Sequence, residues 1–402
     1  MFHIKSIYLV ALLIFISCSN KRKKTPPPTD QGFIAHPIPS KMPHANVKAK
    51  LLKLKSVKNG NARSPLPQSL QMVSNYLNND SLLIRQKSLD ILTSGDIEFA
   101  SLDKTNLLIL DERENTLWQY NLKTNEAKKI AGQGRGPGDL IFTKDIAVFN
   151  NKFLVSMQGY KISMFNCTSG ICEYEKTLKT EFNNYSITAG NENFYVLAVP
   201  PFGRDQDPDP VNTNQYTIHK FDYEGELIQS FSPIYQHRAP LVRDRMVAEG
   251  YVNFFPNTNI LAATFSFFPY IYIYDDSGTL ISKYKIPNFK QPYYSYKQRG
   301  GDFSGKLKYN DNSSIEYSKK VGDKWLLLRF RERRNLDLIS RKEGFKGDEW
   351  NAYYVFNIEK SAFYKLGRDK KNHQPLTGGI NLYPTNKGLI LNKDSTITWI
   401  SI

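Results

Sequence analysis

The feature that most constrains the fold is a loose repeat of strand-and-turn units from residue 81 onward. Apolar or aromatic runs of four to seven residues alternate there with turn residues, and no long stretch has helical periodicity. This pattern predicts many short antiparallel strands. Five times, a strand ends in an aromatic residue followed by Asn or Asp, and a turn and another strand come next. The five pairs are Tyr120-Asn121, Phe165-Asn166, Phe221-Asp222, Tyr274-Asp275 and Phe356-Asn357.

The spacing of these units predicts a β-propeller built from four-stranded antiparallel blades. A further strand precedes each hairpin, and the pairs recur 45 to 82 residues apart. A blade needs about 40 to 50 residues, so we interpret the excess as loop insertions. A sixth unit starts at Ile380, but the chain stops before its outer strand. We expect residues 82–92 to supply that strand, which predicts an all-β, six-bladed propeller over residues 81–402 closed by an N-terminal strand.

The sharpest local motif is the glycine-rich run Gly132-Gln-Gly-Arg-Gly-Pro-Gly-Asp-Leu140. Glycine permits turns with positive φ, so the run can carry the chain from an outer strand to the next blade. A phosphate-cradling loop is the alternative, but the Lys-Ser/Thr of a P-loop is missing and no helical pattern follows. Arg135 could pair or bind a ligand at the mouth of the central funnel. The predicted inter-blade loop comprises Gly132, Gly134, Arg135, Gly136, Pro137 and Gly138.

This motif, after the outer strand of a blade, resembles NHL-type propellers and, more closely, the six-bladed β-propeller lipoproteins of Gram-negative bacteria. The resemblance covers residues 81–402 and the leader. It implies the fold more firmly than a function, because the biochemical role of that group is largely unassigned.

The leader indicates export and a lipid anchor. Lys5 precedes an apolar run, Ile7–Ile16, that is short for a membrane span, and Cys18 follows the predicted cleavage point. The segment resembles the bacterial lipoprotein signal, in which such a Cys is lipidated, although Phe15 and Ile16 depart from the usual residues. An ordinary signal peptide or a membrane anchor is the alternative. We therefore expect a signal peptide at 1–17, a lipidated flexible tether at 18–48 and a segment of undetermined structure at 49–80.

The net charge of +16 is concentrated in these first segments. Residues 1–24 carry five Lys or Arg and no acid, and Lys21–Lys24 would attract anionic head groups beside the anchor. Because an exported chain rarely meets nucleic acid, nucleic acid is not an expected partner. Basic residues after Cys18, rather than acidic ones, favour the outer membrane facing the periplasm. We expect a monomer.

Apart from Cys18, the cysteines are Cys167 and Cys172, which bracket Thr-Ser-Gly-Ile between two predicted strands. An oxidising compartment permits a disulfide across this hairpin. A metal site is the alternative, but two cysteines without nearby histidine supply too few ligands.

Sites for chemistry are sparse in the sequence. Asp205, Asp207 and Asp209 alternate like the start of a calcium loop, but the glycine and glutamate of such a loop are replaced by Pro210 and Tyr216. We interpret the loop as solvated. No cofactor is expected, and a divalent metal such as calcium is the only candidate.

Two insertions mix aromatic and basic residues, which are typical of recognition surfaces on a rigid scaffold. Packing between blades, with solvated charges, is the alternative interpretation. The candidate binding residues are Tyr293, Tyr294, Tyr296, Arg299, Arg331, Arg333 and Arg334.

The sequence thus favours a cell-envelope module that binds a small ligand or an envelope protein. The alternative is a propeller enzyme, a lyase or hydrolase, with a metal-assisted site in the central funnel. No catalytic residue is assigned, and no Gly-x-Ser-x-Gly elbow is present.

Overall fold

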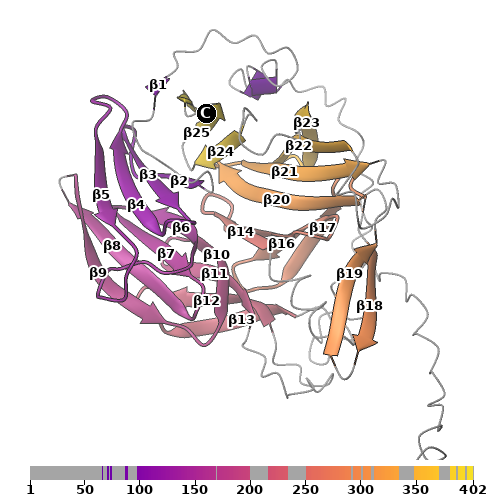
Figure 1. Cartoon of the computed structure of the whole chain (residues 1–402), viewed down its shortest axis with the longest axis horizontal. Coiled ribbons are helices and arrows are strands. Elements are labelled where there is room, and N and C mark those ends of the chain that lie inside the picture. The colour runs from indigo at the N-terminus through magenta and orange to yellow at the C-terminus, as the bar shows by residue number, and fades with distance from the viewer. Residues whose placement is uncertain are drawn as a thin grey trace, which may run out of the picture.

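The computed structural model is an all-β propeller of four-stranded antiparallel blades (Figure 1). The residues it describes are 66, 70, 71, 73, 74, 87–88, 97–168, 170–199, 216–233, 250–290, 293–299, 302–308, 312–334, 348–370, 381–385, 388–393 and 396–401. The lipidation residue Cys18, the tether at 18–48 and the aspartates Asp205, Asp207 and Asp209 lie outside them.

Five blades each consist of four consecutive strands. The first is β2 (Ile97–Ser101), β3 (Asn106–Asp111), β4 (Thr116–Asn121) and β5 (Ala127–Ala131). The second is β6 (Thr143–Phe149), β7 (Lys152–Met157), β8 (Lys161–Thr168) and β9 (Ile171–Lys179). The third is β10 (Asn183–Ala189), β11 (Asn193–Val199), β12 (Tyr216–Asp222) and β13 (Leu227–Pro233). The fourth is β14 (Gly250–Phe255), β15 (Ile260–Phe265), β16 (Tyr270–Asp275) and β17 (Leu280–Lys285). The fifth is β20 (Asn312–Val321), β21 (Trp325–Arg334), β22 (Asp348–Asn357) and β23 (Ala362–Lys370).

The expected six complete blades are therefore corrected to five. The place between the fifth and first blades is taken by a closing sheet of β24 (Asn381–Thr385), β25 (Gly388–Lys393), β26 (Thr396–Ser401) and β1 (Lys87–Ser88). In this sheet β1 pairs with β26, with Lys87 opposite Ile397 and Ser88 opposite Thr396. β24 contacts the inner strands of both neighbouring blades, β2 and β20.

The aromatic–Asx repeat ends the third strand in four blades, and in the second blade it lies two residues before the end of β8. All five aromatic side chains are buried. The following Asn or Asp accepts hydrogen bonds from backbone amides of the next turn in four blades, for example from Gly225 N and Glu226 N to Asp222 Oδ1, both at 2.8 Å. An Asx side chain that satisfies turn amides fixes the hairpin, which explains why the pair recurs.

The apolar core lies between neighbouring blades rather than at the axis. Buried clusters join the first blade to the second, the second to the third, the third to the fourth and the fourth to the fifth. A short helical segment upstream of residue 81 also joins the fold, because Leu70 and Val73 pack against Trp325 and Leu366 of the fifth blade.

One hairpin stands outside the blades. β18 (Tyr293–Arg299) and β19 (Asp302–Lys308) form a separate two-stranded sheet between the fourth and fifth blades in the chain. Figure 1 shows it at the rim, apart from the ring of blades.

Candidate functional site

The innermost strands place polar side chains together at the propeller axis. Lys319 is partly buried and the others are buried, and they come from all five blades: Glu98 on β2, Asp145 on β6, Ser186 on β10, Asn253 on β14, and Ser318 and Lys319 on β20. We call this set the axial network.

Asp145 is the best-connected acid of the axial network. Its side chain is 2% exposed and forms an ion pair with Lys319. Its second oxygen, Oδ2, accepts hydrogen bonds from Ser186 Oγ at 2.7 Å and Ile187 N at 3.0 Å. The Oδ1 atom also accepts from Ile146 N at 2.7 Å. Three blades are therefore linked through one carboxylate.

Lys319 reaches from the fifth blade to the first and second. Besides Asp145, its ammonium lies 3.7 Å from Glu98 Oε2, and its side chain is 14% exposed. Burial disfavours the charge, but the facing Asp145 and Glu98 carboxylates outweigh it and raise the pKa of Lys319 above its usual value. Lys319 is thus a permanent internal cation at the axis.

Two glutamates at the axis hold their protons unusually tightly. Burial raises the pKa of Glu98 to about 7, opposed by Lys319 and reinforced by Asp145. Burial also raises the pKa of Glu112, in the β3–β4 turn, to about 8, and the charge of Glu98 adds to this effect. The Glu112 side chain is 27% exposed and lies 3.9 Å from Lys144 Nζ. Glu112 is therefore a partly exposed acid that interacts electrostatically with the buried Glu98 of the axial network.

The start of β14 and the paired strands β20 and β21 add further charged and aromatic groups. Tyr251 donates a hydrogen bond to the backbone carbonyl of Glu316 at 2.6 Å. Burial, followed by the nearby Glu98 and Glu316 carboxylates, raises the pKa of Tyr251. Arg331 Nη2 lies 2.6 Å from Glu316 Oε2, and the Arg329 guanidinium lies 5.8 Å from the centre of the Tyr317 ring. Charged and aromatic side chains of β14, β20 and β21 are therefore in contact with one another here.

Of the predicted binding residues, the structure describes the side chain of Arg331, in its ion pair with Glu316. Arg333 and Arg334 lie on the same strand, β21, opposite Glu349 and Asp348 of β22. Tyr293, Tyr294, Tyr296 and Arg299 lie on β18 of the separate hairpin, not with Arg331 on the fifth blade.

The glycine-rich loop closes on itself between β5 and β6. Leu140 N donates to Gly132 O at 2.9 Å, and Asp139 Oδ2 accepts from Gly136 N at 2.7 Å. A Cβ on Gly134 would collide with the Asp139 carboxylate, which would have to move away from its hydrogen bond with Gly136 N. Gly138 adopts φ +82°, against Tyr174 of the second blade, and Arg135 is exposed in the loop. Pro137 is exposed beside it.

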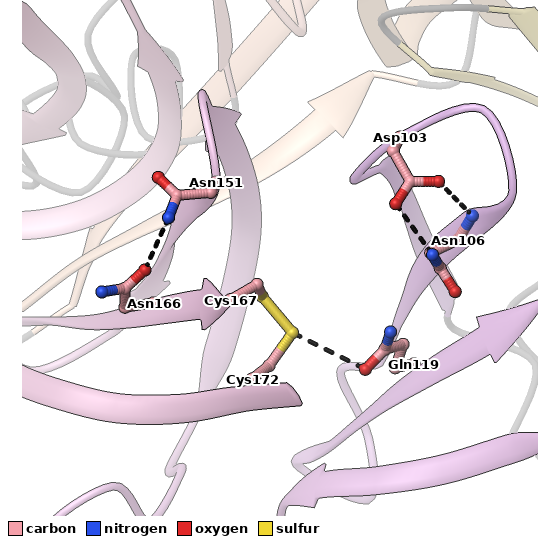
Figure 2. The surroundings of a disulfide bond; sticks show 7 residues. All are labelled: Asp103, Asn106, Gln119, Asn151, Asn166, Cys167 and Cys172. Carbon is pink, nitrogen blue, oxygen red and sulfur yellow. Dashed lines mark hydrogen bonds between the residues drawn. A yellow bond between two sulfur atoms is a disulfide. The ribbon is translucent and has the colours of Figure 1, made fainter. Parts of the chain in front are cut away.

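Cys167 and Cys172 form a disulfide across the β8–β9 hairpin, where the register pairs them directly (Figure 2). Both are buried in the cluster between the first and second blades. Cys172 Sγ lies 3.6 Å from Gln119 Oε1 of the first blade. Because a disulfide sulfur carries no hydrogen, this is a packing contact between blades. The disulfide is a feature of the blade interface and does not touch the axial network.

The axial network was missed at the sequence level because its members are far apart in the chain. Asp145 and Lys319 are separated by 174 residues. The sequence does hold one usable signal, since Glu98, Asp145 and Lys319 each put a charge on the first strand of a blade next to at least one residue that becomes buried.

Within the described residues, no group of three or more His, Cys, Asp or Glu side chains is placed to hold a metal ion. None of the helices among those residues is both long and apolar enough to cross a bilayer.

No family model and no curated protein matches the chain. Solved structures do resemble it. A member of the DUF4221 family from Bacteroides vulgatus aligns with a TM-score of 0.49 and 11% identity, over 80% of this chain and 97% of that chain. Virginiamycin B lyase from Staphylococcus aureus aligns with a TM-score of 0.43 and 11% identity, over 79% and 99%. A β-propeller domain from Myceliophteria thermophila gives 0.38 and 10%, over 79% and 99%. These are likenesses of fold, so membership of the lipoprotein group stays a prediction.

Proposed function

We propose that this chain is a lipid-anchored binding protein of the cell envelope, in which a rigid propeller presents a recognition face. The observation that carries the proposal is the buried ammonium of Lys319 between Asp145 and Glu98. The protein's own cation neutralises the carboxylates at the axis, where a propeller enzyme of the alternative type would need acids free to bind a metal.

The hydrogen bonds of Asp145 support this reading. A carboxylate that already accepts from Ser186, Ile187 and Ile146 and pairs with Lys319 has little capacity left for another ligand. Such a network stabilises a rigid ring, and binding on rigid scaffolds is usually carried by loops and strand ends.

The recognition face that we favour comprises Glu112, Lys144, Glu316 and Arg331. These side chains are partly exposed, and Lys144, Arg331 and Glu316 supply both signs of charge. Mixed charges suit a ligand that itself carries an ammonium and a carboxylate, such as an amino acid or a peptide terminus, because each group finds an opposite partner.

A metal titration tests the binding reading against a metal-assisted enzyme. Calcium, manganese and zinc would be titrated separately by calorimetry into the wild-type protein and Asp145→Asn. We expect the heat of metal binding to be the same for the wild type and for Asp145→Asn. Submicromolar binding to the wild type that disappears in Asp145→Asn would overturn the proposal.

One specific observation favours the enzyme alternative: the raised pKa of the partly exposed Glu112. A carboxyl group that stays protonated near neutral pH can act as a general acid. Turnover of an ester or lactone panel that Glu112→Gln abolishes, without loss of folding, would favour this alternative.

The anchor is tested separately. Cys18→Ala should move the protein from the membrane fraction to the soluble fraction, because lipidation needs the thiol. The matched control, Cys167→Ser with Cys172→Ser, should stay with the membrane. In intact cells, added protease should leave the protein whole if it faces the periplasm, and should degrade it only after the outer membrane is permeabilised.

A further inference from the structure

Two aromatic residues of the second blade have a backbone conformation that aromatic residues rarely adopt. Within the described part of the chain, nine residues other than glycine have φ between +49° and +72°, and seven of them are Asn or Ser. The other two are Phe142, at φ +49°, and Tyr160, at φ +72°. Glycine and Asn tolerate this left-handed region, whereas a bulky side chain there costs conformational free energy. The backbone therefore gains nothing from an aromatic residue at either position.

The same two rings are exposed, so they contribute little to the apolar core. Phe142 is 62% exposed and Tyr160 is 39% exposed, and they are the aromatic members of the exposed large apolar side chains in the described residues. Leaving an apolar ring in water is unfavourable, and so is the backbone conformation of these residues. Two separate costs at the same two residues indicate that the rings are kept for binding rather than for folding.

The backbone around Phe142 is held by two neighbouring turns. The carbonyl of Phe142, which directly precedes β6, accepts a hydrogen bond from Gln158 N of the β7–β8 turn at 2.8 Å. The next residue, Thr143, donates its amide to Asn115 Oδ1 of the β3–β4 turn at 2.9 Å. These contacts join the first and second blades, so the position of Phe142 is fixed before any partner arrives.

Tyr160 lies in the β7–β8 turn, at the same end of the second blade as Phe142. Its carbonyl accepts a hydrogen bond from Thr180 N, directly after β9, at 2.8 Å. The two rings share this end because the start of β6 pairs with the end of β7, with Thr143 opposite Met157. The same end carries Lys144, the second residue of β6 and a member of the recognition face.

Lysines flank the two rings. Lys161 directly follows Tyr160 and lies opposite Lys179 across β8 and β9, and both lysines are exposed. Lys144 is a third cation at this end of the second blade, where Glu181 is an exposed acid. An excess of cations beside exposed rings favours a partner that carries a carboxylate next to an apolar side chain.

We propose that Phe142 and Tyr160 anchor the carboxyl-terminal residue of a peptide or protein chain on the recognition face. An apolar side chain at that terminus packs on the two rings, and its terminal carboxylate binds the lysines beside them. Aromatic residues are typical hot spots, and a ring fixed in advance loses little entropy on binding. A fluid lipid surface adapts to any placement of a ring and gives no reason for a costly fixed backbone. The inference rests on the binding function proposed above and names the partner of that face.

Peptides of defined terminus test the proposal. The probes are dye-labelled hexapeptides with Leu, Phe, Gly or Asp at the carboxyl end, each as the free acid and as the amide. Fluorescence anisotropy with the detergent-solubilised full-length protein measures their dissociation constants. We expect free acids that end in Leu or Phe to bind at least about tenfold more tightly than their amides and than peptides that end in Gly or Asp. No binding, or equal binding of acids and amides, would overturn the proposal.

Phe142→Gly identifies the site of binding. This change removes the ring and suits the φ of +49°, so we expect the fold to be retained and the Kd to rise at least about tenfold. The matched control is Ile171→Ala, because Ile171 is 51% exposed in the β8–β9 hairpin, at the opposite end of the same blade. Equal affinities of Phe142→Gly and the wild type, or an equal loss in the control, would overturn the proposal.

Phe142→Ala tests the cost of the backbone conformation. Both variants at 142 lack the ring and should lose peptide binding equally, but Phe142→Gly should melt at the higher temperature because glycine tolerates the left-handed region. An Ala variant that melts as high would show that the conformation carries no cost and would overturn the argument for a functional ring.

Two further outcomes locate a failure. Peptide binding that Phe142→Gly retains and Arg331→Gln abolishes would reject the aromatic anchor and leave the proposed recognition face standing. Sedimentation with phosphatidylglycerol vesicles, measured in a Cys18→Ala background, gives the other outcome. Vesicle binding that Phe142→Gly abolishes, in a protein that binds none of the peptides, would assign the rings to a membrane and overturn the proposal.

Discussion

The axis of the propeller and the turns of the fifth blade place charge in different surroundings. At the axis, the buried acids Glu98 and Asp145 come from two blades and meet the cation Lys319 from a third. In the turns of the fifth blade, Lys324 pairs with Glu359 where both side chains are about half exposed.

The difference lies in what each pair contributes to stability. A buried charge is costly to leave without its partner, whereas an exposed ion pair contributes little. Substitutions at the axis should therefore lower the free energy of unfolding strongly, and substitutions of exposed charges should lower it little.

The largest expected effect is at Lys319. Lys319→Met removes the cation and leaves Asp145 and Glu98 buried without it, which should lower the free energy of unfolding by about 3 to 5 kcal/mol. Urea denaturation at pH 7 measures it. The control is Lys324→Met, because Lys324 pairs with Glu359 where both side chains are about half exposed, and its loss should stay below about 1 kcal/mol. Equal losses in the two variants would break the comparison.

Removing the disulfide, which lies in the interface between the first and second blades, should cost an intermediate amount of stability. Changing Cys167 and Cys172 together to Ser should cost about 2 kcal/mol, since the closed loop is short and the chain-entropy term is correspondingly small. Thermal unfolding in the presence and absence of reductant measures the cost. A loss of stability as large as that of Lys319→Met would show that the disulfide contributes as much to the stability of the propeller as the charges at the axis.

The pH dependence of stability sharpens the view of the axis. Glu98 has a pKa of about 7 in the folded protein, above the usual 4.5, so the folded state binds its proton more tightly than the unfolded state. The free energy of unfolding should therefore fall as pH rises from about 4.5 to about 7. Glu98→Gln should flatten this fall, leaving the contribution of Glu112, whose pKa is raised in the same direction. A slope unchanged in Glu98→Gln would show that Glu98 titrates normally.

The smallest effect on stability is expected from exposed lysines of the first blade. Lys123→Gln combined with Lys128→Gln should change the free energy of unfolding by no more than about 0.5 kcal/mol, as for other surface sites. The same urea denaturation checks it. A loss of several kcal/mol would mean that these exposed charges matter as much as buried ones and would remove the contrast with the axis.

The sequence predicted the propeller and its four-stranded antiparallel blades because their signals are local. An aromatic followed by Asn or Asp places a buried ring and a turn-capping side chain next to each other, as at Phe221 and Asp222. The number of complete blades was wrong because the closing sheet depends on the pairing of β26 with β1, Lys87–Ser88, which is distant from it in the chain.

The axial network could not be predicted because it is a property of the closed ring. Whether Glu98, Asp145 and Lys319 face the axis depends on the register of three blades that are distant in sequence. Arg331 was predicted to contribute to a cationic patch, yet its charge is matched by Glu316, which occupies the neighbouring strand β20. Sequence alone names the charged residue but not its partner.

The most direct test of the central claim, that the axis is held by matched charges, is a double-mutant cycle between Lys319 and Asp145. The free energies of unfolding of Lys319→Met, Asp145→Asn and the double variant would be compared with the wild type at pH 7. Direct pairing predicts that the double variant loses less than the sum of the single variants, with a coupling energy of about 1 to 3 kcal/mol. Losses that add to within about 0.5 kcal/mol would contradict it, because residues in contact across the axis cannot behave as independent sites.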